Sequence, residues 1–419
     1  MSRQEVLVLS ETAAATVRAT LPVIGSTIGE ITPIFYRRMF AAHPELERDL
    51  FNRGNQAQGD QQRALAGAIV AYATLLVSQE RADVDSLLAR IAHKHASLGI
   101  APDQYPIVHR HLFEAIGEVL GDAATPEVVA AWDEVYWDMA HALIRIEKGL
   151  YAGFGVSPQE VWQDLVVVER RQESPDTVSF RVGRRDGGEL AQARPGQYVS
   201  VQVTLPDGAQ QIRQYSLTRA PRRTTWGFTV KAVPETEGDG VAVPAGEVSN
   251  FLHDNLFEGD SIRCSLPFGD LVLEDGRDPL LLVSAGIGCT PVIGMLHHLV
   301  RTESDRAVTV LHADRSPARH PHRQELAELV DRLEGGRLHH WYEDLGARPA
   351  TETVRRGLID LDAADIDPDA QVYLCGPLPF MAVVRERLAE RGVPESHVHY
   401  EVFGPDTWVP HALPQPATA

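Results

Sequence analysis

His95 is the first candidate for chemistry in this sequence, because its polar ring falls on an otherwise apolar helix face. Leu88, Ile91 and His95 recur at spacings of three and four residues, which places them on one stripe of a predicted helix, whereas His93 falls off that stripe. A histidine that faces a core is usually a hydrogen-bonded core residue, but a neutral imidazole is also a common metal ligand. The spacing alone leaves these two alternatives open.

Two further polar side chains interrupt apolar helix faces. Gln61 opens the apolar face of a helix that we expect to run from Asp60, its N-cap, to Ser78. Glu147 follows Leu143 by four residues on the buried face of the last helix predicted before residue 150. A carboxylate in a core costs free energy unless it is paired or hydrogen-bonded. Glu147 is therefore either a buried residue with a partner or a solvated residue at the end of its helix.

A polar strand later in the chain could bind a phosphate and an aromatic ring on one face. In the alternating run Ile212–Thr218, Arg213 and Tyr215 share one face, while Gln214 and Ser216 share the other. An arginine on a strand is usually only a solvated charge. The strand therefore indicates a cofactor site only if other motifs accompany it.

A strand, a glycine turn and a helix start follow one another at residues 280–291. Gly286 and Gly288 lie in this turn, in the order that brings a backbone close to a pyrophosphate. The third glycine of the GxGxxG fingerprint is missing, so a structural turn and a cofactor loop are both compatible with the spacing. Asp314 and Arg315 follow the next strand, where the ribose or its 2′-phosphate is often recognised. Their opposite charges leave NADH and NADPH open.

Composition divides the chain into parts that must position these residues. Residues 1–150 hold 9 of the 33 glycines and 6 of the 27 prolines and are expected to be helical, whereas the rest is rich in turns. Short β-rich runs from residue 165 to 266 predict an antiparallel barrel or sandwich, and apolar strands alternating with helical stretches after residue 279 predict a parallel α/β sheet. We therefore predict domains at 1–150, 151–275 and 276–405, followed by a loose tail at 406–419.

Length, charge and cysteine usage narrow the class of protein. The 419 residues suffice for two to four domains, and 39 Lys plus Arg against 58 Asp plus Glu give a net charge of −19. This balance disfavours nucleic acid or an anionic membrane as the main partner, so small molecules are expected instead. Three separated cysteines and the lack of an apolar export signal fit a cytoplasmic location. We expect a monomer with no obligate membrane partner.

Three segments before residue 150 resemble the globin domain of flavohaemoglobins. They are FYRRMF at Phe35–Phe40, LFNRGNQAQGDQQRAL at Leu50–Leu65 and IAHKHASLGIAPDQY at Ile91–Tyr105. The resemblance implies that His95 is the proximal ligand of the iron in haem b. It implies further roles near the haem for these residues: Tyr36 and Gln61 as the distal polar pair, Phe51 against the haem, Leu65 as the distal apolar gate, Lys94 as a charge beside His95, and Tyr105 with Glu147 as partners of His95. Without the resemblance, both tyrosines would be interpreted as ordinary core residues.

The strand with Arg213 resembles the RxYS motif of ferredoxin-reductase-like flavoproteins. RPGQY at Arg194–Tyr198 and GEVSNFL at Gly246–Leu252 also match that family. The resemblance implies FAD, with the arginine on the pyrophosphate, the tyrosine over the isoalloxazine, the serine near its reactive edge and the helix start at residue 246 receiving phosphate oxygens. The FAD residues expected are Tyr198, Arg213, Gln214, Tyr215, Ser216, Gly246, Val248 and Ser249.

Three more segments resemble the nucleotide-binding part of the same proteins. GIGCTP at Gly286–Pro291 is similar to their nicotinamide loop, YLCGPLPFM at Tyr373–Met381 to their CGP segment, and HYEVFGP at His399–Pro405 to the stretch that returns to the flavin. The cofactor residues implied are Gly286, Ile287, Gly288, Cys289, Thr290, Pro291, Cys375, Gly376, Glu401, Val402, Phe403, Gly404 and Pro405. Val402 replaces the family's usual cysteine, which we expect to alter packing at the flavin. Cys289 replaces a frequent glutamine, which we expect to alter cofactor fit or oxidation sensitivity.

The resemblance covers about residues 20 to 405 and implies three domains: an all-α globin domain, an antiparallel β-barrel FAD domain and an α/β parallel-sheet NAD(P) domain. NAD(P)H gives up hydride, and a flavin passes electrons on singly to haem. The implied activity is that of a nitric oxide dioxygenase, which converts NO and O2 to nitrate. The alternatives are an oxygen-binding or oxygen-sensing globin with its own haem reductase, and a flavin reductase that acts on another acceptor.

Overall fold

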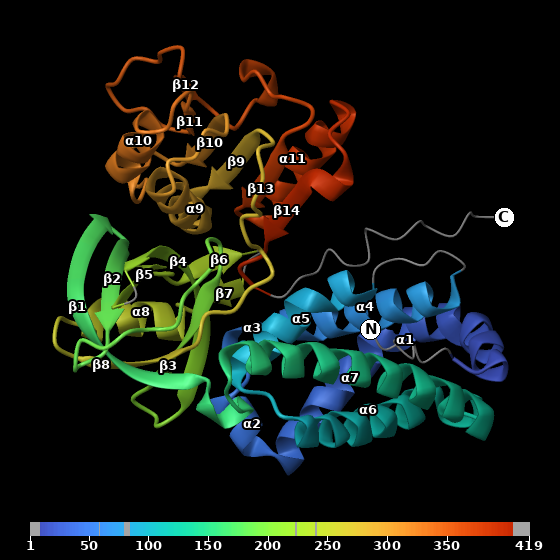
Figure 1. The fold of residues 1–419 in the computed structure, drawn as a ribbon. Helices are drawn as coiled ribbons and strands as arrows, with labels where there is room; N and C mark the ends of the chain where they lie inside the picture. Colours follow the sequence, from blue (N-terminus) through green and yellow to red (C-terminus); the bar gives the residue numbers. More distant parts are fainter. Residues whose placement is uncertain (1–8, 58, 79–83, 223, 239–240, 405–419) are drawn as a thin grey trace. The chain divides into compact units, whose positions relative to one another are not determined.

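The computed structural model describes residues 9–57, 59–78, 84–222, 224–238 and 241–404 (Figure 1). The described chain packs as two compact units. The first consists of residues 9–161, 206–212 and 404, and the second of residues 162–205 and 213–403. The predicted tail at 406–419 and the predicted cofactor residue Pro405 lie outside the described residues.

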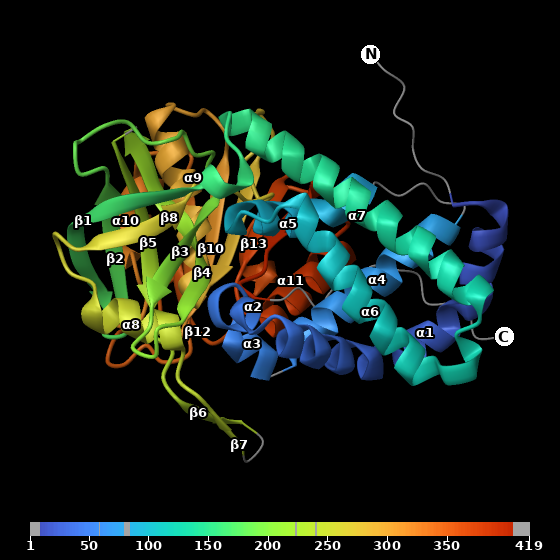
Figure 2. The same cartoon turned by 90° about the horizontal axis from the view of Figure 1, so that it is seen from below.

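The first unit is helical, as the sequence predicts. Its helices are α1 (Glu11–Ala42), α2 (Pro44–Asp49), α3 (Arg53–Ala57), α4 (Asp60–Val77), α5 (Val84–Leu98), α6 (Tyr105–Leu120) and α7 (Pro126–Phe154). Helix α1 packs against α4, α6 and α7, and α5 packs against α7 (Figures 1 and 2). The apolar stripe of α1, which includes Ile24, Ile31, Phe35 and Met39, is buried in the core of this unit. Burying such a stripe is what stabilises a helix within a bundle.

The start of α4 differs from the prediction by one residue. Asp60 is the first residue of the helix and not its N-cap, because the cap position belongs to Gly59. Gly59 has φ +73, a left-handed conformation that glycine adopts without the steric penalty of a side chain. The helix ends at Val77, with Ser78 as its C-cap.

The second unit begins with a closed barrel, one of the two β architectures that the sequence predicts. The strand order around it is β1-β2-β5-β4-β3-β8. The strands are β1 (Trp162–Ser174), β2 (Thr177–Gly183), β3 (Tyr198–Thr204), β4 (Gln210–Arg222, which starts in the first unit), β5 (Thr225–Lys231) and β8 (Ser261–Ser265). Helix α8 (Glu247–Asn255) accompanies the barrel, and a hairpin of β6 (Thr236–Gly238) and β7 (Val241–Val243) extends away from it (Figure 2). Alternate side chains such as Val178, Phe180 and Val182 fill the barrel core.

A parallel sheet with helices completes the second unit and confirms the predicted α/β part. Its strand order is β12-β11-β10-β9-β13-β14. The elements are β9 (Leu280–Ala285), α9 (Cys289–Arg301), β10 (Val308–Asp314), α10 (Arg323–Asp331), β11 (Arg337–Tyr342), β12 (Val354–Arg356), β13 (Gln371–Cys375), α11 (Leu378–Glu390) and β14 (Val398–Glu401). The chain order reverses between β9 and β13, and in such sheets ligands bind beyond the carboxyl ends of strands at this reversal.

Short 3₁₀ turns lie at Pro102–Gln104, Gly121–Ala123, Pro158–Glu160, Gly286–Gly288, Leu361–Ala363 and Glu395–His397. No helix in the described ranges has both the length and the apolar character needed to cross a membrane.

Candidate functional site

Helices α5, α6 and α7 bring three of the predicted site residues into contact. Nδ1 of His95 on α5 lies 2.8 Å from Oε1 of Glu147 on α7 and 3.2 Å from the hydroxyl of Tyr105, the first residue of α6. The Tyr105 hydroxyl donates a 2.6 Å hydrogen bond to the same Glu147 oxygen. Tyr136 donates in turn to the Tyr105 carbonyl at 2.7 Å, which ties the start of α6 to α7. These residues therefore form a single network around one carboxylate oxygen.

The burial of this network keeps the proton on the Tyr105 hydroxyl. Burial, and then the neighbouring Glu147 charge, raise the pKa of Tyr105 far above its ordinary value, so its hydroxyl stays a donor. A carboxylate oxygen accepts hydrogen bonds, so Oε1 of Glu147 accepts from the Tyr105 hydroxyl and, in the tautomer protonated at Nδ1, from His95. With Nδ1 engaged, Nε2 is the ring nitrogen left to bind a metal, which is the arrangement that a histidine ligand of iron requires. The donor set thus fits a proximal haem ligand.

The distal residues predicted from the sequence lie in the core of the same unit. Tyr36 on α1 is buried, and its ring meets that of Phe51 edge-on, with 5.9 Å between centroids. Burial raises the pKa of Tyr36 well above its ordinary value, and the interaction with Gln61 only partly offsets this rise. Leu65, on α4, packs against the same core. Tyr36 is consequently a protonated hydrogen-bond donor in an apolar setting.

The segment that carries Phe51 is held by a residue that the sequence analysis missed. Gln211 is fully buried, and its Nε2 lies 3.1 Å from the Phe51 carbonyl oxygen and 3.0 Å from that of Arg48. Its Oε1 accepts from the Arg53 N–H at 3.4 Å, and Asp207 forms an ion pair with Arg53 at 2.7 Å. No local pattern predicts these contacts, because the residues that they join lie more than 150 positions apart. Lys94 lies beside His95 on α5 and is partly buried.

Strand β4 displays the predicted flavin residues. Tyr215 stacks on Phe228 with 5.6 Å between ring centroids, and burial raises the pKa of its hydroxyl. Ser216 is buried, and the Gln214 side chain donates to Ser200 at 3.0 Å. Arg213 is partly buried on the same strand. An aromatic ring and a cation thus follow each other along β4, which fits a ring system joined to a phosphate.

Two turns support the predicted flavin site. Tyr198, at the start of β3, lies against Gly269, where an added Cβ would come within 3.1 Å of the tyrosine ring. Gly246 caps α8 without a side-chain hydrogen bond, and a Cβ there would come within 2.6 Å of Ser249 Oγ. Val248 is buried and anchors the first turn of α8. The backbone N–H groups of this turn are of the kind that bind phosphate oxygens.

The glycine turn after β9 and the CGP segment after β13 touch each other. A Cβ on Gly288 would lie 2.4 Å from the carbonyl oxygen of Cys375, so only glycine allows this approach. Strand β14 pairs with β13 and sets Glu401, which is buried, beside Cys375. These predicted nicotinamide residues therefore gather beyond the carboxyl ends of β9, β13 and β14, where the chain order reverses. A dinucleotide fits this edge.

The remaining predicted residues extend from this edge. Ile287 accepts a hydrogen bond from the Thr290 hydroxyl at 3.0 Å, which tightens the turn into α9, where Thr290 and Pro291 are buried. Val402 is buried, Phe403 is half exposed and Gly404 has φ +148. Gly376 lies close to the ring of Phe380.

Cys289 lies at the first position of α9 and is fully buried. Burial raises the pKa of its thiol, which keeps the sulfur protonated and unreactive at neutral pH. Oxidation sensitivity at this position, one of the two consequences expected from the sequence, is therefore disfavoured. An effect on cofactor fit stays a prediction.

Comparisons with known proteins agree with this arrangement. Three family models match: Globin over residues 34–143, Oxidoreductase FAD-binding domain over residues 164–272 and Oxidoreductase NAD-binding domain over residues 282–386. A flavohemoprotein of Bordetella pertussis is 42% identical over 410 residues, which cover 94% of this chain and 98% of the relative. One of Rhizobium meliloti is 39% identical over 408 residues, covering 93% and 97%.

Two solved structures match this chain, one over nearly all of it and one over its FAD- and NAD-binding part. A crystal structure of flavohemoglobin from Malassezia yamatoensis with bound FAD and heme has a TM-score of 0.83 and 36% identity and covers 94% of this chain and 100% of that one. The FAD/NAD-binding domain of nitric oxide dioxygenase from Vibrio cholerae has a TM-score of 0.52 and 36% identity and covers 58% of this chain and 99% of that one. With relatives this similar over nearly their full length, the chain belongs to the flavohemoprotein family.

Proposed function

We propose that this protein is an NAD(P)H-dependent nitric oxide dioxygenase that uses haem b and FAD. Two NO and two O2 become two nitrate ions while one NAD(P)H is oxidised to NAD(P)⁺ and a proton is released, so atoms and electrons balance. The observation that carries the proposal is the network in which His95 and Tyr105 share one oxygen of Glu147. The Vibrio cholerae structure, whose protein is named a nitric oxide dioxygenase, supports the reaction.

The residues of α5, α6 and α7 would hold and tune the haem. When bound, haem supplies an iron that carries O2 and changes by one electron, and FAD supplies a carrier that accepts hydride and releases electrons singly. His95 would bind the iron through Nε2. Glu147 and Tyr105 fix the ring orientation and keep the Nδ1 proton shared with a carboxylate, which raises the basicity of the ligand.

The residues of α1 and α4 would shape the distal pocket. Tyr36 keeps its proton because it is buried, and so offers a hydrogen-bond donor where negative charge develops during the reaction. Gln61, which interacts with the tyrosine hydroxyl, would orient it. Phe51 and Leu65 would line this region with apolar surface.

The second unit would deliver the electrons. Arg213 would pair with the FAD pyrophosphate, Tyr215 would cover the flavin ring, and the first turn of α8 would receive phosphate oxygens. The turn at Gly286–Gly288 and the segment at Cys375 would hold the nicotinamide. Glu401 would lie near the electron-exchange site of the flavin, and Phe403 against the flavin ring.

A direct assay tests this function. Purified holoprotein is mixed with NADH or NADPH, O2 and NO, and both NO loss and nitrate formation are followed, with haem-free protein as the control. Nitrate that accumulates faster with holoprotein supports the proposal. Equal rates would refute it, and rapid NAD(P)H oxidation with an added acceptor but no nitrate would indicate a flavin reductase. Small molecules are the expected partners, and a monomeric state and a cytoplasmic location stay predictions.

A further inference from the structure

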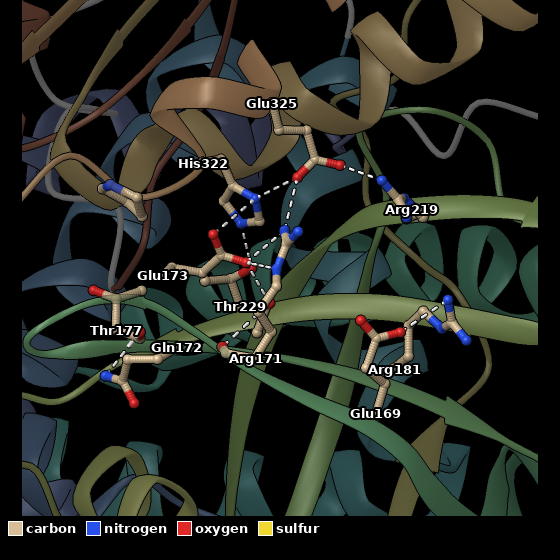
Figure 3. Close-up of polar contacts among 12 residues, drawn as sticks. Glu169, Arg171, Gln172, Glu173, Thr177, Arg181, Arg219, Thr229, His322 and Glu325 are labelled. Atoms are coloured by element: carbon tan, nitrogen blue, oxygen red, sulfur yellow. Dashed lines mark hydrogen bonds and ion pairs between the residues drawn. The ribbon is translucent and has the colours of Figure 1, made fainter. Parts of the chain in front are cut away.

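Charged side chains meet where the barrel packs against the parallel sheet, within the second unit (Figure 3). Glu325 on α10 contacts side chains from both parts. From the barrel, Arg171 on β1 places Nη2 3.1 Å from Glu325 Oε2, and Arg219 on β4 forms an ion pair with Oε1. Two barrel strands that are not neighbours in the sheet are thereby attached to one residue of the nucleotide-binding part.

The other two partners of Glu325 come from the nucleotide-binding part itself. His297 on α9 places Nε2 2.8 Å from Oε1, and Nδ1 of His322, just before α10, lies 2.8 Å from Oε2. The Glu325 side chain is only 13% exposed. One carboxylate thus connects β1, β4, α9 and the start of α10 in surroundings where solvent screens little.

A second buried carboxylate extends the cluster on the barrel side. Glu173 on β1 lies 2.7 Å from Nη2 of Arg171 and 3.7 Å from Nδ1 of His322, and it accepts a 2.5 Å hydrogen bond from Ser179. Figure 3 shows Arg171 between the two carboxylates. The barrel therefore contributes positive and negative side chains to this contact. Because each charge must meet its opposite, these contacts favour one position of α10 on the barrel.

His322 connects the cluster to the nicotinamide loop. Its φ is +56, a left-handed conformation that is costly for a residue with a side chain, so the surrounding contacts must hold it. Those contacts are Glu325 on one ring nitrogen and Thr229 of β5, 2.7 Å from the other. The preceding Pro321 places its carbonyl oxygen 3.8 Å from the sulfur of Cys289, the first residue of α9.

Helix α9 also touches the flavin strand directly. A Cβ on Gly294 would lie 2.3 Å from the carbonyl oxygen of Leu217, which follows Ser216 on β4. His297, one turn further along the same face of α9, reaches Glu325. The helix that starts at the nicotinamide loop is therefore packed on the strand that carries the predicted flavin residues, and Glu325 fixes it there.

The electrostatics favour a permanently charged Glu325. Burial raises the pKa of Glu325, but hydrogen bonds with His297 and His322 and the charge of Arg219 outweigh this and hold the pKa well below its usual range. Removing one member of such a cluster leaves charged partners buried without compensation. The contact is expected to fail as a whole when Glu325 loses its charge.

We propose that Glu325 is a positioning residue for hydride transfer, which locks α9 and α10 onto the flavin barrel and so holds the nicotinamide loop at a fixed distance from the flavin strand. The proposal rests only on the NAD(P)H and FAD half of the proposed function and does not depend on what reacts at the haem. Hydride transfer is steep in distance and orientation, and a misplacement of about 1 Å can cost about a hundredfold in rate.

The test compares Glu325→Gln with Glu169→Gln in the full-length holoprotein. Glu169 on β1 is the matched control (Figure 3). It forms an exposed ion pair with Arg181 on β2 at 2.9 Å, so this pair joins two barrel strands and does not reach the parallel sheet. Anaerobic stopped-flow mixing with NADH and with NADPH measures the limiting rate of flavin bleaching and its dependence on nucleotide concentration. Nucleotide deuterated at the transferred position reports whether hydride transfer limits the rate.

The expected result is a split between rate and binding. Glu325→Gln slows flavin reduction by about tenfold or more with a full isotope effect, while the apparent nucleotide dissociation constant changes by less than about threefold. FAD content, haem content and electron transfer from dithionite-reduced flavin to haem stay as in the unchanged protein. Glu325→Asp recovers part of the rate, because it keeps the charge with a shorter reach, and Glu169→Gln matches the unchanged protein.

Other outcomes overturn the proposal. A Glu325→Gln protein that melts at lower temperature but reduces its flavin at the normal rate would show a merely structural role. If that variant does not fold, Arg219→Gln decides, since it removes only the contacts that β4 makes with Glu325 and His297. An unchanged rate there would also overturn the proposal, and a slowing with intact FAD content would support it. Flavin reduction in the unchanged protein, measured alongside, tests the proposed function separately.

Discussion

Nδ1 of His95 and Oε1 of Glu147 lie 2.8 Å apart, and the two side chains differ sharply in burial: 32% of the His95 side chain is exposed, against 2% for Glu147. The carboxylate is therefore enclosed by protein, while the imidazole retains an open side. The contacts at Nδ1 set the tautomer and rotation of the ring, which suits Nε2 to bind a metal.

Glu147→Gln should weaken the effect of the proximal histidine on the iron without removing the haem. The amide keeps the shape of the carboxylate but not its charge, so the imidazole loses basicity. We expect haem to be retained, the iron–histidine stretching frequency in Raman spectra of the ferrous protein to fall, and nitrate formation to slow by about tenfold or more. Glu134→Gln, an exposed position on the same helix, is the control. An unchanged stretching frequency would contradict the assigned role.

The helix register at α5 separates two neighbouring histidines. His95→Ala should lose stable haem, because its Nε2 is the atom that would bind the iron, whereas His93→Ala should keep haem. The Soret absorbance per protein, measured after gel filtration, distinguishes the two. Haem that survives His95→Ala and is lost from His93→Ala would show that the register is assigned wrongly.

Tyr36 should stay protonated over an unusually wide pH range. Its raised pKa means that the donor form persists as the pH rises through 10, where an exposed tyrosine would lose its proton. We expect O2 dissociation from the ferrous protein to be flat up to about pH 10. Tyr36→Phe should speed this dissociation by about ten to a hundredfold, because it removes a hydrogen bond to a charged acceptor. A tyrosinate transition below pH 10 in difference spectra would argue against the buried donor.

Gln211 is predicted to stabilise the segment that carries Phe51. Gln211→Leu leaves the partly buried carbonyls of Arg48 and Phe51 without this donor, which should lower the free energy of unfolding by about 1 to 3 kcal/mol and speed haem loss to apomyoglobin. Gln210→Ala is the control, since its side chain is exposed and its backbone N–H makes the contact with Asp49. Equal rates of haem loss from the two variants would contradict the role of Gln211 in stabilising this segment.

Local patterns predict the fold well, because periodicity reports which face of an element is buried. The β-rich runs at residues 165–266 and the apolar strands after residue 279 follow directly from spacing, and the structure has them as the barrel and the parallel sheet. The predicted start of α4 was wrong by one residue. Asp60 has a side chain typical of an N-cap, but the left-handed conformation at the cap position favours Gly59. The boundary between β1 and β2 is harder to predict, because the two-residue turn that joins them, Pro175 and Asp176, is not one of the glycine-containing pairs typical of tight hairpins.

The residues of the candidate site also differ in how far a local sequence pattern can predict them. Glu147 is recognisable as an acid on an apolar face, and the glycine turn at Gly288 by its place after a strand. Gln211 and Glu325 carry no such sign, because each joins its own segment to residues that are more than 100 positions away in the chain. Only the packing of distant segments shows that these polar side chains hold the predicted cofactor residues in place.

Gly288→Ala should impair the nucleotide site while leaving the flavin bound. The new Cβ would lie 2.4 Å from the Cys375 carbonyl oxygen and 2.6 Å from its carbon, so β9 and β13 would have to separate at the edge where the nicotinamide is expected. Flavin reduction by NAD(P)H should then show a nucleotide dissociation constant raised by about tenfold, with FAD content unchanged. Gly276→Ala is the control, because a Cβ there meets no atom within 4 Å. Loss of FAD in Gly288→Ala, with normal nucleotide binding in what remains, would place this turn at the flavin instead.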